Sequence, residues 1–158
     1  MFREMRRFKQ RLSEKECVEV LKNEPRGVLS VAGDDGYPYG MPLDHYYEEE
    51  SGKIYFHGAA AGHRIDSIRR DNRVSYCVYD KGYRNDGDWA LNIRSVIVFG
   101  RIREAEDKEL IRKVLRNLSH KFTDDEKYIE DEIIRNIGHV KILEITVEHM
   151  TGKLVNES

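Results

Sequence analysis

The apolar residues of segment 73–80, RVSYCVYD, fall at every second position, and this alternation limits the fold more than any other feature of the chain. A period of two is typical of a strand with one buried face. Together with five similar segments it predicts six strands, at 28–31, 37–47, 53–57, 73–80, 93–105 and 139–149. Short turns such as Asp34–Gly36 favour an antiparallel meander. Because closure removes exposed edges, we expect a mainly β, α+β fold, an antiparallel barrel with peripheral helices.

Helical spacing of apolar residues predicts four helices, near 13–24, 64–70, 106–122 and 123–138. Ser13 and Glu16 form a capping box at the start of the first helix, and Pro25 ends it. Thr123 is the predicted cap of the last helix, which ends at Gly138. These helices interrupt the strand pattern without a linker, so we expect one domain over residues 1–158.

The composition excludes several classes of function. The 158 residues carry a net charge of −2, which provides no overall attraction to nucleic acid or to an acidic membrane. The sequence contains no apolar run near the ~20 residues needed to span a bilayer and no secretory signal at its start. Cys17 and Cys77 are not spaced for zinc binding. We therefore expect a cytoplasmic protein with reduced thiols, no metal, no nucleic-acid partner and no membrane partner.

The turn after the third strand, HGAAAGHR at 57–64, lacks bulky side chains just before a helix begins. Free backbone N–H groups at a helix start attract anions, and cations such as His63 and Arg64 are unfavourable there without one. A phosphate would supply the anion, and Arg64 could bind it with two N–H groups. The alternative is an ordinary loop of small residues with a solvated arginine. The turn fits neither a Walker loop nor a GxGxxG motif.

Three longer segments carry a resemblance when taken in order: GVLSVAGDDGYPYGMPLDHYYE, KIYFHGAAAGHRIDSIRRDNRVSYCV and SVIVFGRIRE. They resemble the pyridoxamine 5′-phosphate oxidase-like FMN-binding split barrels, specifically the nitroimidazole-resistance branch. The similarity runs from about Ser13 to Glu104 and, more loosely, to HMTGK near the end. It implies a six-stranded split barrel and a homodimer that holds two FMN molecules in clefts between the subunits.

The resemblance also implies a set of cofactor-binding residues. The second strand would line the flavin ring, and the third strand with its turn would hold the ribityl phosphate. His63 departs from the basic pair that the family usually has at 63 and 64. The implied contacts are Met41, Pro42, Leu43, Asp44, His57, Gly58, Ala59, Gly62, His63, Arg64 and Ser95.

His57 is the candidate catalytic residue, since an imidazole beside the flavin could orient substrate or exchange a proton. The alternative is a strand histidine bonded to a neighbouring carbonyl. Trp89, the only tryptophan, either anchors its loop or covers a flavin face across the dimer. The chain lacks the Trp/Arg-rich end that binds substrate phosphate in true pyridoxamine phosphate oxidases, so that substrate is not assigned.

These features predict an FMN-dependent oxidoreductase that passes electrons from NAD(P)H to a small acceptor such as a nitro-aromatic compound. The chain shows no Ser-His-Asp set and no metal spacing, which fits chemistry carried by a cofactor. The alternative is a flavin or haem protein without turnover, a binding or sensor module on the same barrel. Haem would need an axial ligand such as His45, His57 or His63. A deazaflavin could replace FMN at the same turn.

Overall fold

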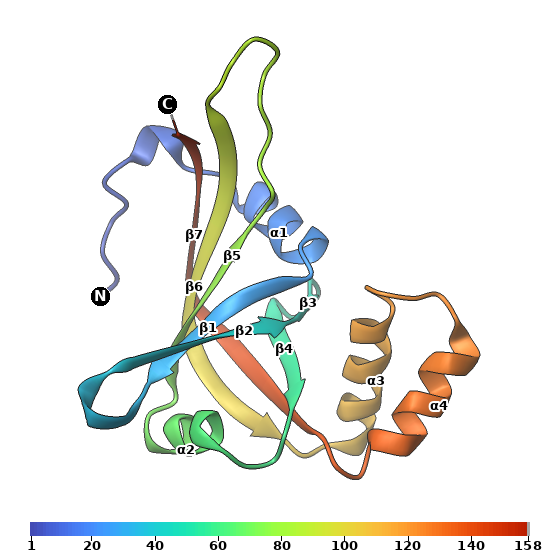
Figure 1. Ribbon diagram of the computed structural model, residues 1–158. Coiled ribbons are helices and arrows are strands. Elements are labelled where there is room, and N and C mark those ends of the chain that lie inside the picture. The colour runs from blue at the N-terminus through green and yellow to red at the C-terminus, as the bar shows by residue number, and fades with distance from the viewer. Residues whose placement is uncertain (158) are drawn as a thin grey trace.

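The alternating segments form one curled antiparallel sheet in a computed structural model that describes residues 1–157 (Figure 1). Within these residues the sheet has seven strands in the order β2-β1-β5-β6-β7-β4-β3. The strands are β1 Arg26–Ala32, β2 Pro38–Asp44, β3 Tyr46–Glu48, β4 Lys53–Gly58, β5 Arg73–Tyr79, β6 Leu91–Ala105 and β7 Lys141–Glu157. The predicted α+β split-barrel class is confirmed, with one strand more than the sequence pattern indicated.

The additional strand arises because the predicted strand 37–47 is broken at His45. β2 pairs with β1 at one edge of the sheet, and β3 pairs with β4 at the other. His45 is fully buried; its Nδ1 lies 2.8 Å from Tyr76 Oη and its Nε2 lies 2.6 Å from Leu21 O. The Tyr76 hydroxyl is shared with Leu43 O, also at 2.8 Å. These contacts hold the His45 side chain in the core, so that β2 ends just before His45 and β3 begins just after it. His45 is thus the single residue between the strands at the two edges of the sheet.

The two longest strands, β6 and β7, pair from Leu91↔Glu157 to Ala105↔Ile142. Their register shifts between Phe99 and Gly100, as expected for a β-bulge that bends a strand. β7 also continues well beyond 149, where the sequence pattern placed its end.

Four α-helices and two 3₁₀ turns within residues 1–157 accompany the sheet: η1 Phe8–Gln10, α1 Glu14–Asn23, η2 Asp34–Gly36, α2 His63–Arg70, α3 Lys108–Ser119 and α4 Glu126–Asn136. The capping box of α1 is confirmed, since Ser13 N donates to Glu16 at 2.7 Å and Glu16 N donates to Ser13 Oγ at 3.2 Å. The predicted cap of α4 is wrong. Asp125, rather than Thr123, accepts the N–H of Tyr128 at 3.0 Å, because its carboxylate stands directly before the first helical residue.

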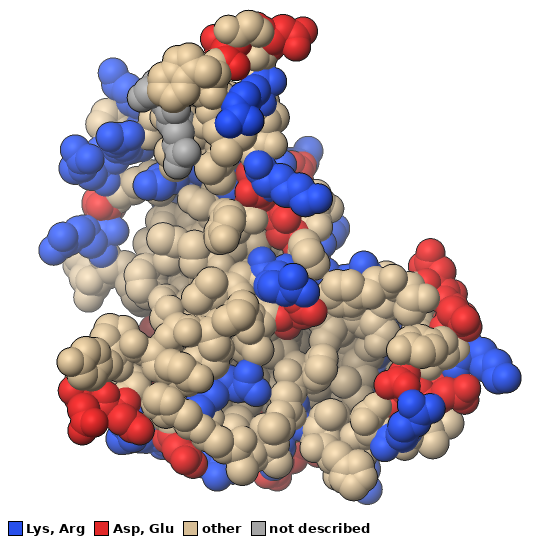
Figure 2. Space-filling model, viewed as in Figure 1, with Lys and Arg blue, Asp and Glu red and all other residues tan. Residues whose placement is uncertain are grey.

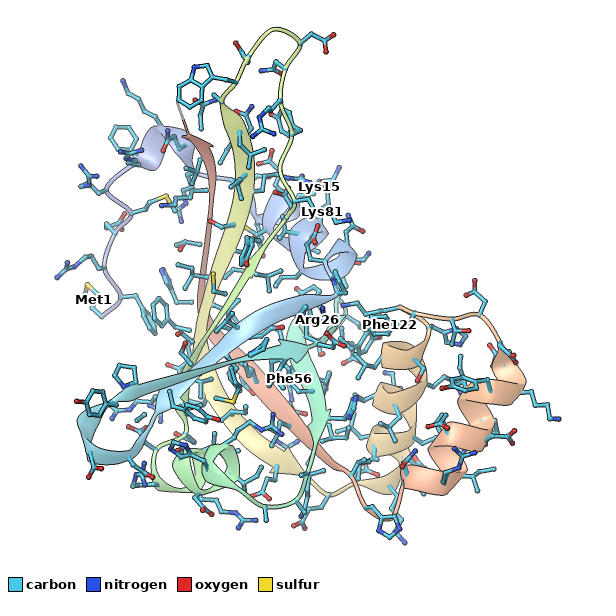
Figure 3. The ribbon with its side chains drawn as sticks, viewed as in Figure 1. Met1, Lys15, Arg26, Phe56, Lys81 and Phe122 are labelled. Atoms are coloured by element: carbon cyan, nitrogen blue, oxygen red, sulfur yellow. The ribbon has the colours of Figure 1, made fainter. Side chains whose placement is uncertain are left out.

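Apolar side chains gather in two clusters, one on each face of the curled sheet. The first fills the barrel, where Phe56 is fully buried (Figure 3). The second lies between α3, α4 and the opposite face of β4 and β7, and includes Tyr55 and Ile142. α2 lies at the lower end of the barrel, and α3 and α4 stand to one side of it (Figure 1). None of the helices in the described part of the chain is long and apolar enough to cross a membrane.

Candidate functional site

The turn between β4 and α2 presents free backbone groups, as its small residues predict. Gly62 has φ 124°, which strongly favours glycine, and it precedes α2 without a side chain capping the helix. The first N–H groups of α2 therefore have no partner within the helix or from a cap. Ala59 and Gly62 are both exposed, so a ligand can approach this backbone directly.

Arg64 lies across Gly58 at the end of β4. A Cβ placed on Gly58 would collide with Arg64 Nη2 and would stand 3.1 Å from Arg64 Cζ. The Nε atom of Arg64 is buried and has no hydrogen-bond partner. A buried guanidinium N–H without a partner is costly, and an anion bound beside it would remove that cost. The bare glycine and the unpartnered Nε together fit a phosphate group at this turn.

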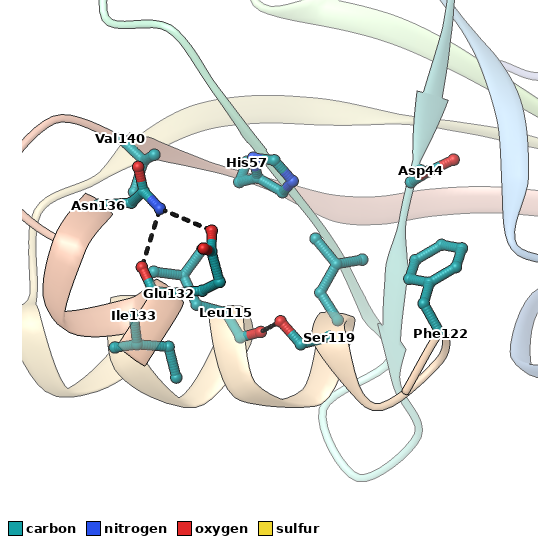
Figure 4. A pocket seen from close by; sticks show the side chains of 10 residues that line it. Asp44, His57, Leu115, Ser119, Phe122, Glu132, Ile133, Asn136 and Val140 are labelled. Carbon is teal, nitrogen blue, oxygen red and sulfur yellow. Dashed lines mark hydrogen bonds between the residues drawn. The ribbon is translucent and has the colours of Figure 1, made fainter. Parts of the chain in front are cut away.

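The structure brings Asp44 and His57 together at one pocket. The pocket has a volume of about 360 Å³ and is lined by Asp44, His57, Leu115, Leu118, Ser119, Phe122, Glu132, Ile133, Asn136 and Val140 (Figure 4). Its walls are mostly apolar and come from α3, α4 and the loops that follow them. Asn136 Nδ2 donates to Glu132 Oε2 at 3.2 Å and to Glu132 O at 2.9 Å, which fixes the polar wall opposite His57.

His57 is open to this pocket, yet the protein around it is dense enough that burial lowers the pKa of the ring. The positive charge of Arg64 lowers the pKa of His57 further, whereas Asp44 opposes both effects. Asp44 itself accepts a hydrogen bond from Arg26 Nε at 2.6 Å. The imidazole is thus neutral at neutral pH and can donate one hydrogen bond and accept another.

Two of the predicted residues, His63 and Ser95, do not face the space beside Arg64 in this chain. His63 stacks on Tyr39, with ring centroids 4.1 Å apart, and its Nε2 lies 3.5 Å from Asp34 Oδ2. The His63 ring therefore contacts residues of the β1–β2 hairpin. Ser95 lies near the start of β6, about ten residues from Ala105, which corresponds to roughly 33 Å of extended strand. Helix α2, which carries Arg64, lies at the Ala105 end, since its Arg69 pairs with Glu104 at 2.8 Å. Ser95 and Arg64 of one chain therefore lie at opposite ends of the sheet.

The remaining predicted residues follow the free edge of β2. Met41 and Leu43 are half-buried and pack on the barrel core, and Pro42 points outward. Their backbone pairs with β1 on one side only.

The pocket residues of α3 and α4 were missed by the sequence reasoning, because an amphipathic helix pattern shows which face is apolar but not what that face surrounds. No group of three or more metal-binding side chains occurs among residues 1–157.

A family model described as pyridoxamine 5′-phosphate oxidase matches residues 13–154. The chain belongs to this family. The suspected pyridoxamine 5′-phosphate oxidase-like membership is thereby confirmed, over nearly the whole barrel. Comparison with curated proteins gives no match.

Solved structures share the fold of this family member. A protein from Bacteroides thetaiotaomicron, provisionally described as a 5-nitroimidazole antibiotic resistance protein, has a TM-score of 0.76 and 20% identity, over 92% of this chain and 87% of that chain. An FAD-binding protein from Mesorhizobium loti has a TM-score of 0.64 and 25% identity, over 92% and 97%. An FAD and haem binding protein from Mycobacterium smegmatis has a TM-score of 0.72 and 16% identity, over 92% and 73%.

Proposed function

We propose that this protein is a flavin-binding oxidoreductase that holds FMN with its phosphate at the turn between β4 and α2. The observation that carries the proposal is the buried, unpartnered Nε of Arg64 beside Gly58. Arg64 and the first N–H groups of α2 would bind the phosphate, since a helix start and a guanidinium both favour a dianion. The exposed turn allows that group to lie against the backbone.

The free edge of β2, from Met41 to Asp44, would line the ring. A flavin held there would supply the redox chemistry, hydride uptake from NAD(P)H and electron transfer to the acceptor. The chain itself would position the flavin and the acceptor and would supply protons. His57 lines the neighbouring pocket with a neutral ring, and it would donate a hydrogen bond to an acceptor oxygen.

The pocket supports a small, uncharged, planar acceptor such as a nitro-aromatic compound. Its walls, including Leu115, Leu118 and Phe122, are mainly apolar and suit an aromatic ring. The carboxylates of Asp44 and Glu132 line the same space and would disfavour an anionic acceptor. Its volume of about 360 Å³ limits the acceptor to a compact molecule.

We further propose a homodimer with the flavin between subunits. Ser95 cannot reach the Arg64 turn of its own chain, because the two lie at opposite ends of the sheet. A second copy could bring its own Ser95 to that turn. The outer sheet face carries partly exposed apolar side chains at Val28 and Ile97, which a partner would cover.

A haem-binding module remains the second candidate, because one protein of this fold is described as binding both FAD and haem. His45 is unsuited as an axial ligand, since both of its ring nitrogens are already engaged inside the core. His57 is the better placed histidine, because its ring is open to the pocket. FAD and a deazaflavin would also fit a phosphate site at the turn.

The absorption spectrum of the purified protein tests this proposal. Flavin bands, present as purified or after adding FMN, are expected. A Soret band would favour haem, and protein that stays colourless with FMN and with haem would refute cofactor binding altogether. Bleaching of the bound flavin by NADH or NADPH would support an enzyme over a passive binder.

The Arg64→Ala variant tests the phosphate site. FMN affinity should fall roughly tenfold or more, the loss of a charge-assisted hydrogen bond, while riboflavin affinity stays nearly constant. Arg69→Ala is the matched control, since Arg69 lies on the same helix but pairs with Glu104 at 2.8 Å. Equal losses for FMN and riboflavin in Arg64→Ala would mean that Arg64 supports the fold instead.

A further inference from the structure

One lysine side chain ties the end of α3 to the barrel. Lys121 is half-buried, and its Nζ donates to Glu24 O at 2.9 Å and to His45 O. Glu24 is the C-cap residue of α1, and His45 is the residue between β2 and β3. These acceptors lie 97 and 76 residues from Lys121 in the chain. The ammonium group therefore joins three distant segments through charge-assisted hydrogen bonds, which are the stronger kind.

The residues next to this contact in the chain belong to the pocket. Phe122 follows Lys121, and it lines the pocket. Asp44 precedes His45, and it lines the same pocket. Figure 4 shows the Phe122 ring and Asp44 together at one end of that space. Because each of them is one residue from an end of the Lys121–His45 bond, this bond sets the spacing between the two walls.

The other restraints on Phe122 are few. Its side chain is 55% exposed, and its backbone N–H donates to Ser119 O at 2.9 Å in the turn that ends α3. An ion pair between α3 and the barrel, Lys113 with Glu48, lies about two helical turns earlier. Charged side chains are sparse where α3 approaches the barrel in Figure 2. Loss of the Lys121 bonds should therefore free the Phe122 ring without releasing the helix.

We infer that Lys121 is a positioning residue of the acceptor pocket, which holds Phe122 at a fixed distance from Asp44 and thereby sets the size of ring that the pocket admits. The inference rests on the proposed function, since it concerns the acceptor of that reaction. With the bonds in place, Phe122 would pack against the ring of a compact nitro-aromatic acceptor, and such aromatic pairs depend on close, offset spacing. Without them the pocket would bind a compact ring more weakly and discriminate less against a larger one.

The charge of Lys121 makes this contact sensitive to pH. Burial lowers the pKa of Lys121 to about 8, whereas the carboxylates of Asp44 and Glu24 oppose that shift. Asp44 is itself paired with Arg26. The buried His45 ring adds no charge, because its pKa is held at about 4. As the pH rises through about 8, a charge-assisted bond is replaced by a weaker bond from a neutral amine.

Fluorine NMR of protein labelled with 3-fluorophenylalanine tests the contact without any flavin. The chain has five phenylalanines, and the signal that is missing from Phe122→Leu identifies Phe122. In the unchanged protein this signal should shift with a midpoint near pH 8. It should not shift there in Lys121→Arg, because a guanidinium keeps its charge. A Phe122 signal that stays constant in the unchanged protein between about pH 7 and 9.5 would overturn the inference.

Lys121→Met keeps the length of the side chain and removes its donors, so it tests the effect on the acceptor. In flavin-loaded protein, KM for nitrobenzene should rise roughly 2- to 10-fold with kcat little changed, which corresponds to the loss of one aromatic pair. KM for the larger 1-nitronaphthalene should rise less. Lys121→Arg should retain most of the preference for nitrobenzene. Lys127→Met is the matched control, since Lys127 is exposed on α4, and both KM values should stay constant.

A folded Lys121→Met protein that keeps both the Phe122 signal and the preference for nitrobenzene would overturn the inference. If Lys121→Met does not fold, the pH titration of the unchanged protein decides the matter. Protein that binds no flavin would instead refute the proposed function, and the fluorine signal would still show whether Lys121 positions Phe122.

Discussion

Replacing Gly58 by alanine tests the phosphate site without removing any charge. The added methyl group would occupy the space of the Arg64 guanidinium, colliding with Nη2 and lying 3.1 Å from Cζ. Because these atoms form the far end of a flexible side chain, Arg64 can move aside, so the free energy of unfolding should change by less than about 1 kcal/mol.

The displaced guanidinium should no longer donate a hydrogen bond to the phosphate of FMN. Loss of one charge-assisted hydrogen bond costs about 1.5–3 kcal/mol, which corresponds to roughly a 10- to 100-fold weaker affinity for FMN. Riboflavin, which lacks the phosphate, should bind as before. The ratio of the two dissociation constants thus isolates the phosphate contribution from any effect on the ring.

Flavin fluorescence titration measures both dissociation constants, and thermal denaturation checks the fold of the same samples. Gly138→Ala is the matched control, because a Cβ there meets no atom within 4 Å. An unchanged FMN-to-riboflavin ratio in a Gly58→Ala protein that melts normally would refute the role given to Gly58 and Arg64. A large fall in melting temperature would show that the space beside Gly58 serves the fold.

Three further predictions concern the stability of the barrel. Tyr76→Phe should lower the free energy of unfolding by ~1–3 kcal/mol in urea denaturation, since Leu43 O loses its donor and His45 Nδ1 loses its hydrogen-bond partner. A denaturation midpoint equal to that of the unchanged protein would contradict this. Burial holds the pKa of His45 at about 4 in the folded protein, against an ordinary value of about 6.5. Between these two pH values, His45 takes up a proton when the protein unfolds. Stability should be full above about pH 6.5 and fall by on the order of 3 kcal/mol towards pH 4, and a flat profile between pH 7 and 5 would count against the buried neutral ring. Gly100→Ala should destabilise by ~1–3 kcal/mol in the same assay, because a Cβ would strike the backbone oxygen of Thr146, which cannot move aside; an unchanged midpoint would show that the bulge is pliable.

Local signals predicted the parts of the fold that depend on neighbours in sequence. The capping box at Ser13 and the alternation in β5 both depend on residues a few positions apart, and both are confirmed. The cap of α4 was misassigned because Thr123 and Asp125 both precede the helix with suitable side chains. Only the geometry shows that Thr123 Oγ1 instead accepts the N–H of Asp125, at 3.2 Å.

Contacts between distant residues could not be predicted in this way. His45 breaks a continuous strand pattern because Leu21 and Tyr76, 24 and 31 residues away, engage its ring. Similarly, the turn at Gly58 was recognisable as a phosphate candidate from its small residues, but the unpartnered Nε of Arg64 depends on packing. The pocket beside His57 combines residues from two strands and two helices, and no spacing in the sequence marks it.

The position of α3 and α4 in the chain has a consequence for how this barrel can diversify. β6 and β7 are direct partners, so the stretch 106–140 between them is an elaborate connection within a single hairpin. That one stretch provides eight of the ten residues around the pocket, whereas the phosphate turn is encoded elsewhere. Grafting 106–140 from another family member would therefore exchange the pocket walls in one piece, provided that the graft keeps an apolar side against Tyr55 and Ile142.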